Sequence, residues 1–289
     1  MNTIPSISLI VCTHNRADIL DHSLSFYANI KTEVDYEILV VVNACKDHTL
    51  DIIRKHTATN PKIIQVVETA IGHSNARNAG WENANAPFIF YIDDDAYPNP
   101  NIIDELYRLI NSKSINCISG RTVYWDYNPP KWIKPSFVEV PTFREDFGEM
   151  PSHGYINGCA CGFSIQALKK AGGFNPKVGM TGKKIGYYDE IYMQDKLKSL
   201  GHIIHYSPEL IVNHQSHLII ITFFKTHYLQ GKSRKQFAAF STFKVAYYSL
   251  VSLMKGNVYL FPNWVKHGSS PGTVKSYSSL FNYLGQLIA

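Results

Sequence analysis

The 289-residue chain lacks several features that mark common classes of protein. No window free of charges and prolines reaches the roughly 20 residues of a membrane-spanning helix. The N-terminus has no basic stretch followed by the apolar core of a signal peptide. The basic residues form no long run, so the net charge of +5 does not by itself indicate nucleic-acid binding. It suits anionic ligands such as nucleotide diphosphates, or an acidic membrane surface, and we expect a location on the cytoplasmic side.

The five cysteines also lack a recognisable arrangement. Cys159 and Cys161 form a C-x-C pair, which alone is not a zinc signature, and no paired metal-ligand spacing is present. The odd number and the scattered positions favour reduced thiols in a cytosolic protein.

What the sequence does contain is a regular alternation of short apolar runs and helical patterns. This alternation predicts a parallel sheet with helical crossovers, in which ligands bind beyond the carboxyl ends of the strands. We therefore look for chemistry in the loops after Cys12, Val42 and Ile92. The predicted strands are 6–12, 37–42, 62–67 and 88–92, and the predicted helices are 17–28, 49–57 and 74–84.

The second half of the chain is less regular. A strand at 117–124 is followed by Trp125–Pro151, a proline- and aromatic-rich excursion without a clear period, typical of a long surface loop. Helices are predicted at 164–171 and 190–200, with a strand at 202–206 between the second helix and the sequence V-N-H-Q. From Ile219 the pattern is helical and aromatic.

The first chemical signal is Asp93-Asp94-Asp95, directly after an apolar strand. Three adjacent carboxylates repel one another, and a hard divalent cation is an effective compensation. The first and third could converge on one ion, or on an ion and a ribose. An acidic, solvated turn explains the triplet equally well.

Three further signals are weak individually. In Gly72–Gly80 (G-H-S-N-A-R-N-A-G) a helix N-terminus and Arg77 could bind phosphate or a base edge, although an ordinary capped helix is the simpler interpretation. Asp189-Glu190 follows a glycine-rich segment and could supply a general base under a mobile lid, or could be a normal helix N-terminal charge. His214 could complete a carboxylate metal shell, or be structural.

The order of these motifs resembles the family 2 glycosyltransferases of the GT-A fold, over roughly residues 5 to 235. The matching pieces are S-L-I-V-C-T-H-N-R at Ser8–Arg16, E-I-L-V-V-V-N at Glu37–Asn43 with Asp47 and Thr49, A-R-N-A-G at Ala76–Gly80, F-Y-I-D-D-D at Phe90–Asp95, G-G-F-N at Gly172–Asn175, Asp189-Glu190, V-N-H at Val212–His214, and Q-G-K-S at Gln230–Ser233. Each piece is weak, and the ordered series is strong.

The resemblance implies a Rossmann-like α/β nucleotide-sugar-binding domain at 1–217, with a nucleotide half at 1–123 and an acceptor half at 124–217. A mainly helical extension would occupy 218–289. It implies an inverting, metal-dependent sugar transfer from a nucleotide-diphosphate donor to a glycan, lipid-linked or other hydroxyl acceptor. The rivals are an inactive nucleotide-sugar-binding or scaffold protein on the same fold, and a nucleotidyltransferase, which normally has a glycine- and lysine-rich loop where this chain has T-H-N-R.

The resemblance also implies roles for individual residues. Thr13, Asn15, Asn43, Arg77 and Asp94 would border the nucleotide sugar. Asp93 and Asp95 look like the aspartate pair that holds ribose and Mn²⁺ or Mg²⁺, with His214 as a further metal ligand. Asp189 and Glu190 correspond to the acidic catalytic pair, whose second member is usually the base.

Two positions depart from the family pattern. Val42 stands where relatives usually have an aspartate that reads uracil, so a preference for uridine does not follow. The catalytic pair reads Asp-Glu where many relatives have Glu-Asp, so either Asp189 or Glu190 could be the base.

The last candidate is an amphipathic helix at Phe237–Met254. Its apolar face carries Phe240, Phe243, Tyr247, Leu250, Val251 and Met254, with lysines and serines opposite. Such a helix could lie at a membrane interface, as a peripheral contact on the inner face of the plasma membrane. It could equally pack against the catalytic domain and shape the acceptor cleft.

Overall fold

The computed structural model describes residues 4–125, 142–181, 186 and 188–215, with short pieces at 224–225, 227–229, 279, 281–282 and 284. The chain divides into two compact units, and all of the site discussed below lies in the first: Met1–Trp125, Glu139–Lys177 and Asp189–Gln215. The predictions for Gln230–Ser233, for the amphipathic helix and for most of the Trp125–Pro151 loop fall outside the described residues. None of the described helices is long and apolar enough to cross a membrane.

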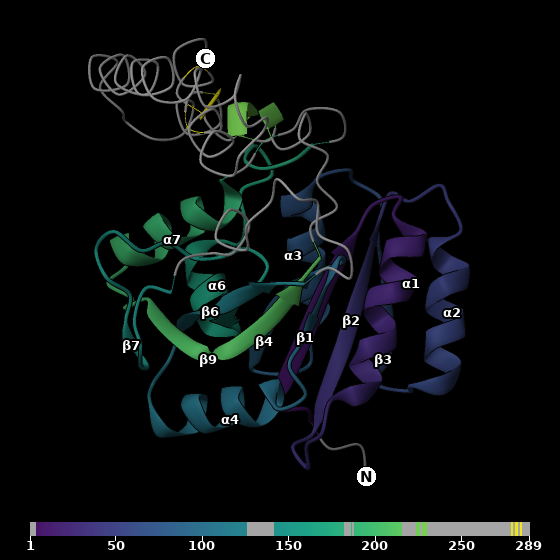
Figure 1. Ribbon diagram of the computed structural model, residues 1–289, viewed down its shortest axis with the longest axis horizontal. Coiled ribbons are helices and arrows are strands. Elements are labelled where there is room, and N and C mark those ends of the chain that lie inside the picture. Colours follow the sequence, from purple (N-terminus) through teal and green to yellow (C-terminus); the bar gives the residue numbers. More distant parts are fainter. Residues whose placement is uncertain are drawn as a thin grey trace, which may run out of the picture. The chain divides into compact units, whose positions relative to one another are not determined.

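The first unit is built on a nine-stranded mixed sheet (Figure 1). Its strand order is β3-β2-β1-β4-β8-β6-β9-β5, and β7 pairs with β9. The first four strands in that order run parallel, as predicted, and β8 then joins β4 in the antiparallel direction. Their bounds are β1 Ile7–Thr13, β2 Tyr36–Asn43, β3 Ile63–Glu68, β4 Phe88–Asp93, β5 Ala96–Pro98, β6 Cys117–Tyr124, β7 Gly148–Glu149, β8 Cys161–Ser164 and β9 His205–His214.

Helices cover both faces of this sheet, because alternate side chains of each strand enter opposite cores. In β1, Ile7, Leu9 and Val11 pack in one core, and Ile10 packs in the other. The first core also takes side chains from α1 Ala17–Ser25, α2 Thr49–Thr59 and α4 Ile102–Ser112. The second takes side chains from α3 His73–Asn83, α6 Ile165–Ala171 and α7 Asp189–Ser199.

The structure corrects four sequence predictions. The helix predicted at 17–28 ends at Ser25 and continues as the 3-10 turn Phe26–Asn29. The sheet is mixed rather than wholly parallel, since the short antiparallel strands β5, β7 and β8 were missed. The helix α4, whose buried residues Ile102, Ile103, Leu106 and Leu109 follow a helical period, was also missed.

The fourth correction concerns the strand predicted at 202–206. It begins at His205 and runs on through Pro208 to His214. The proline is tolerated because the register with β6 shifts between Ser119 and Arg121, which forms an irregularity at that point. His214 is therefore the last residue of a long strand and not part of a loop that follows a shorter one.

Two of the sequence motifs pack against one another on the α3 side. Asn78 donates from Nδ2 to the Phe174 carbonyl at 2.8 Å, and its Oδ1 accepts from the Phe174 backbone N–H at 2.8 Å. Gly173 has φ +72, a left-handed conformation that favours glycine, and Asn78 lies close to it. The motifs A-R-N-A-G and G-G-F-N thus fix each other.

Close packing of α3 on the sheet depends on Gly80. A Cβ at this position would lie 2.6 Å from Cγ2 of Ile10 in β1 and 3.4 Å from Cγ2 of Val41 in β2. The helix therefore approaches the strands more closely than a side chain would allow, and this approach brings Arg77 of the same helix over the sheet.

We predict that Gly80→Ala destabilises the protein, although alanine in a helix interior normally gains about 0.5–1 kcal/mol over glycine. Overpacking against Ile10 costs about 1–3 kcal/mol and should outweigh that gain. The measurement is urea unfolding of Gly80→Ala, Ile10→Ala and the double variant. The double variant should lose less stability than the sum of the single losses, because Ile10→Ala removes the clash. Stabilisation by Gly80→Ala, or strict additivity, would contradict this account.

Candidate active site

The candidate site lies at the carboxyl edge of the parallel strands. Within the sheet, Cys12 of β1 is in register with Asp93 of β4, so the ends of these strands adjoin. Thr13, the last residue of β1, is 2% exposed and donates its hydroxyl to Asp94 Oδ2 at 2.7 Å. The predicted loops after β1 and β4 therefore do meet.

A short antiparallel ladder brings His214, the last residue of β9, to the same edge of the sheet. In the β5–β9 ladder Ala96 is the partner of His214, and Ala96 directly follows the aspartate triplet. The backbone N–H of Gln215 also donates to the Asp95 carbonyl at 2.9 Å. Residues more than a hundred positions apart in the sequence are thus held together by the sheet itself.

Arg16, immediately after β1, partly neutralises the triplet. Its Nη1 lies 2.6 Å from Asp94 Oδ1 and its Nη2 lies 2.6 Å from Asp95 Oδ2. Burial raises the pKa of Asp94 to about 6, despite the attraction of Arg16. Burial acts in the same direction on Asp95, but His214 and Arg16 outweigh it and hold the pKa of Asp95 below its usual range. The triplet therefore contains carboxyl groups of very different acidity.

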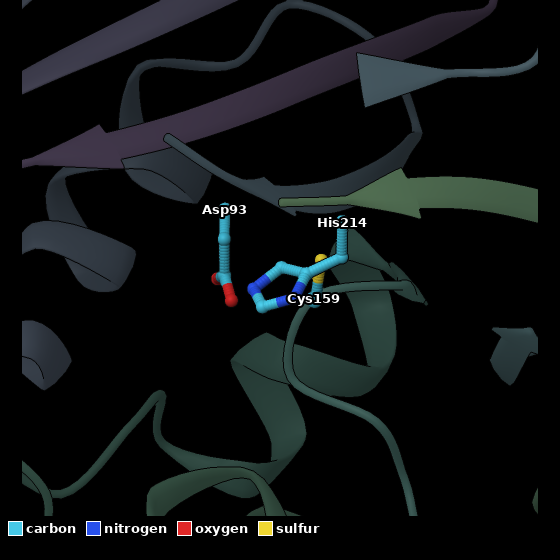
Figure 2. Close-up of side chains that lie close together, drawn as sticks. All are labelled: Asp93, Cys159 and His214. Atoms are coloured by element: carbon cyan, nitrogen blue, oxygen red, sulfur yellow. The ribbon is translucent and has the colours of Figure 1, made fainter. Parts of the chain in front are cut away.

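Three potential metal ligands converge beside this network (Figure 2). One ligand atom from each of Asp93, Cys159 and His214 lies within 4.8 Å of the other two. Asp95 Oδ1 lies 3.1 Å from His214 Nε2, so that both predicted metal-binding aspartates are near the histidine. Burial lowers the pKa of His214, but the charge of Asp95 outweighs this and raises it. Carboxylate and imidazole groups together suit Mn²⁺, Zn²⁺ and related divalent cations.

Cys159 owes its position to a rigid turn between β6 and β8. Asn157, the anchor of this turn, receives a hydrogen bond from the Cys159 backbone N–H on its Oδ1 at 3.2 Å. The Asn157 backbone N–H donates to Ser119 Oγ at 3.0 Å, and its Nδ2 donates to Thr122 Oγ1. Both partners belong to β6, so the turn is fixed to the sheet.

The same turn contacts the second charged cluster. Arg77 of α3 donates from Nη2 to the carbonyl of Gly158 at 3.1 Å. A Cβ at Gly158 would lie 2.8 Å from that nitrogen and 3.5 Å from Cδ of Glu190. A side chain at position 158, one residue from Cys159, would therefore displace the Arg77 guanidinium from its contact with the turn.

Arg77 is a buried cation with a buried anion beside it. Its side chain is 2% exposed, and its Nη1 lies 3.1 Å from Oδ2 of Asp189, whose side chain is 4% exposed. The guanidinium carbon is 5.3 Å from the ring centroids of both Tyr91 and Phe174. His73 adds a contact from Nδ1 to the same Asp189 oxygen at 3.1 Å.

This environment separates the acidities of the two catalytic candidates. Burial opposes ionisation of Asp189, but Arg77 and His73 outweigh it and lower the pKa of that carboxyl. Burial and the negative charge of Asp189 raise the pKa of Glu190 to about 8. Glu190 lies 3.9 Å from Arg77 Nη1, and its side chain is 21% exposed, so that it is the more accessible acid of the pair. Such a divergence of two neighbouring carboxyl groups is typical of acid–base sites.

Asn15 and Asn43, which were predicted to contact the nucleotide, lie in or beside the loops that follow β1 and β2. Asn15 adopts a left-handed conformation with φ 52, and its Oδ1 accepts from the Lys46 backbone N–H at 2.7 Å. Asn43 accepts from the Gly72 backbone N–H on Oδ1 at 2.9 Å and donates from Nδ2 to the Ala70 carbonyl at 2.8 Å. Val42, beside it, is 4% exposed and belongs to a hydrophobic core.

The structure therefore groups the predicted residues into three sets. Asp93 and His214 converge and Asp95 contacts His214. Arg77 joins the acidic pair, and Asn15 and Asn43 brace the loops after β1 and β2. Sequence reasoning missed Arg16, Cys159 and His73 as members of the site. Arg16 and His73 stood inside the quoted motifs, whereas Cys159 gave no signal, because its C-x-C spacing is unrelated to the ligands that it meets.

The comparison with known families identifies the first part of the chain. Residues 8–172 match the model of glycosyl transferase family 2. The chain is 24% identical over 181 residues to a hyaluronan synthase of Pasteurella multocida, and 29% identical over 156 residues to a chondroitin synthase of Escherichia coli. These matches take up 62% and 54% of this chain but only 18% and 22% of the relatives. The chain thus matches about a fifth of the length of either synthase.

A relative of more similar length is an O-antigen chain rhamnosyltransferase of Salmonella anatum. It is 25% identical over 219 residues, which cover 73% of this chain and 66% of the relative.

Solved structures show the same fold at low sequence identity. A mannosyltransferase from Pyrobaculum calidifontis, in complex with GDP-Man and Mn²⁺, has a TM-score of 0.64 at 15% identity, with 98% of this chain and 86% of that chain covered. The S. aureus protein TarS, residues 1–349, in complex with UDP-GlcNAc, has a TM-score of 0.58 at 14% identity, with 97% and 89% covered.

The family model spans more than half of the chain and includes the strand ends, the aspartate triplet and the Gly158 turn that build the site. The fold is that of the GT-A glycosyltransferases, and the chain belongs to glycosyl transferase family 2.

Proposed function

We propose that this protein is an inverting glycosyltransferase that moves a sugar from a nucleotide-diphosphate donor to an acceptor hydroxyl with the help of a divalent cation. The observation that carries the proposal is the turn Asn157–Ala160. It contacts the Asp93–His214 cluster through Cys159 and the Arg77–Glu190 cluster through Gly158. The proposed cation site and the proposed base thus both contact one short backbone segment.

The cation would be held by Asp93, Asp95 and His214. The donor set fits, because Asp93 and His214 offer ligand atoms within 4.8 Å of each other and Asp95 Oδ1 lies 3.1 Å from His214 Nε2. When bound, a Mn²⁺ or Mg²⁺ ion there would neutralise charge on the departing nucleoside diphosphate. The Mn²⁺ in the related mannosyltransferase structure supports this assignment.

Glu190 is the proposed general base, and Asp189 holds the arrangement. Asp189 is neutralised by Arg77 and His73, so it has little tendency to take a proton. Glu190 has a raised pKa and the more exposed side chain, so it can accept the proton of an acceptor hydroxyl during attack. Attack from the face opposite the leaving group inverts the anomeric carbon, as in the inverting glycosidases.

The donor and acceptor are proposed only by class. The related proteins that carry GDP-Man and UDP-GlcNAc support a nucleotide-sugar donor. The synthases and the O-antigen enzyme support a glycan or lipid-linked acceptor and a role in polysaccharide or glycoconjugate biosynthesis. Peripheral membrane contact through the Phe237–Met254 helix remains a sequence prediction.

The proposed activity is tested by following nucleoside diphosphate release from a panel of nucleotide sugars, chosen by thermal shift, with Mn²⁺ and with EDTA. A donor stabilises the protein according to its affinity for the native state. Turnover that needs the cation supports the proposal. Donor binding without any turnover or hydrolysis would instead indicate an inactive nucleotide-sugar-binding protein.

The metal assignment predicts that Asp95→Ala abolishes Mn²⁺ binding and metal-dependent donor binding. His214→Ala should weaken Mn²⁺ binding less severely but by at least roughly 10- to 100-fold, the loss expected even for removal of an outer-shell partner of a metal ligand. Mn²⁺ electron paramagnetic resonance provides the measurement, with Asp51→Ala as a control, since Asp51 lies on α2 with a side chain 69% exposed. Full activity of Asp95→Ala in EDTA would overturn the assignment.

The base assignment predicts that Glu190→Gln keeps donor and metal binding while turnover falls by about 10²- to 10⁴-fold. Because a base acts only when ionised, kcat/KM of the wild type should rise with pH up to about 8, the raised pKa of Glu190, and level off above it. Asp189→Asn removes the negative charge beside Glu190, so the rise of kcat/KM with pH should occur at lower pH. The loss of rate should be smaller than in Glu190→Gln. If Asp189→Asn abolishes turnover and Glu190→Gln does not, the roles are reversed.

The presence of Val42 predicts weak discrimination in favour of uridine, or a preference for another base. Val42 is buried in the core and offers no polar group to a nucleobase. Isothermal titration with UDP, GDP, CDP and dTDP, each with the same cation, measures the preference. If UDP binds far more tightly than the other three, Val42 is not the discriminating position, and Asn43 or Arg77 becomes the candidate.

A further inference from the structure

Cys159 brings a thiol into contact with the proposed cation site. Its ligand atom lies within 4.8 Å of those of both Asp93 and His214, and the three side chains point toward one another in Figure 2. Zinc-type cations bind sulfur at about 2.3 Å and nitrogen or oxygen at about 2.0–2.2 Å in a tetrahedral arrangement, so two ligand atoms of one ion stand about 3.5 Å apart. The observed spacing is compatible with one ion between the three groups.

The position of the thiol is fixed rather than incidental. Asn157 is tied to β6 through Ser119 and Thr122, and its own Oδ1 holds the Cys159 backbone N–H. The neighbouring Cys161 belongs to the opposite hydrophobic core, and its thiol donates to the Gly158 carbonyl at 3.6 Å. The two cysteines therefore face different parts of the protein, and Cys159 alone of the pair faces the ligand cluster.

We propose that Cys159 is a ligand of the bound cation, which makes the centre a mixed oxygen, nitrogen and sulfur site that prefers thiophilic divalent cations such as Zn²⁺, Co²⁺ and Cd²⁺ to Mg²⁺. The inference rests on the proposed function for the existence of the cation site and adds its composition and selectivity. Binding releases the thiol proton to solvent, because the thiolate is the form that coordinates a metal.

The chemistry of the ligands leads to this selectivity. Carboxylate and water ligands suit Mg²⁺ and Mn²⁺, imidazole is suited to Zn²⁺, and thiolate favours softer cations. A thiolate between Asp93 and His214 therefore shifts the affinity order toward Zn²⁺ and Cd²⁺, while Asp93, Asp95 and His214 still offer Mn²⁺ its usual oxygen and nitrogen ligands.

The test uses the full-length protein and Cd²⁺ or Co²⁺ as probe ions. The wild type and Cys161→Ser should show a thiolate-to-metal charge-transfer absorption on saturation, and Cys159→Ser should not. Cd²⁺ affinity should fall by roughly 10- to 100-fold in Cys159→Ser, as for loss of a group at a metal centre, with a much smaller change for Mn²⁺. Cys159→Ala is the second variant, and thermal unfolding checks that each variant is folded.

The outcomes separate this inference from the proposed function. The assignment of a sulfur ligand would be overturned if the charge-transfer absorption persists in Cys159→Ser. It would also be overturned if the wild type binds Mn²⁺ but shows no such absorption with Cd²⁺ or Co²⁺. Either result would leave the cation site itself intact. If the wild type binds neither Mn²⁺ nor Cd²⁺, the cation part of the proposed function fails as well. Cadmium-113 NMR of the wild type reports a sulfur ligand directly, so the inference stays testable even if the Cys159 variants do not fold.

Discussion

The buried ion pair between Arg77 and Asp189 is the interaction on which the rest of the site depends. Neither side chain is more than 4% exposed, and their closest atoms are 3.1 Å apart. Isolated charges are unfavourable in a protein interior, so each of these groups is tolerated only because of the other and its hydrogen-bonding neighbours. Removal of one partner from such a pair typically costs about 3–5 kcal/mol.

This pair organises the site in two directions. On one side Arg77 donates to the Gly158 carbonyl and so holds the turn that carries Cys159 to Asp93 and His214. On the other side burial, together with the charge of Asp189 that Arg77 holds in place, raises the pKa of Glu190. The proposed cation site and the proposed base are therefore parts of one polar network. A change at Arg77 should therefore affect both parts.

The sequence predicted the elements that build the parallel half of the sheet with good accuracy, because their apolar runs and helical periods are local. The motif order also singled out Asp93 and His214, which the structure places at the ends of β4 and β9, and Asp189, which begins α7. It did not predict the packing that joins them. The β5–β9 ladder that places Ala96 beside His214 is only three residues long, and β9 passes through Pro208, which suggests a break to any local interpretation.

The membership of the site was harder to predict for a similar reason. Cys159 lies far in sequence from Asp93 and His214, and hydrogen bonds of its turn to β6 and to Arg77 bring it to them. The buried position of Arg77 was likewise hard to predict, because a motif at a helix N-terminus usually suggests an exposed phosphate contact. In the structure the helix packs closely on the sheet at Gly80. Both features depend on contacts between residues far apart in the sequence, so no local sequence pattern indicates them.

The central claim is that this site transfers a sugar with inversion at the anomeric carbon. The most direct measurement is proton NMR of the first sugar product from an α-linked nucleotide donor, recorded with Mg²⁺ before the anomers of any released sugar equilibrate. The account predicts a β-configured product, whether the acceptor is a glycan or water. An α-configured product would contradict the single displacement by a base-activated hydroxyl and would require a different role for Glu190.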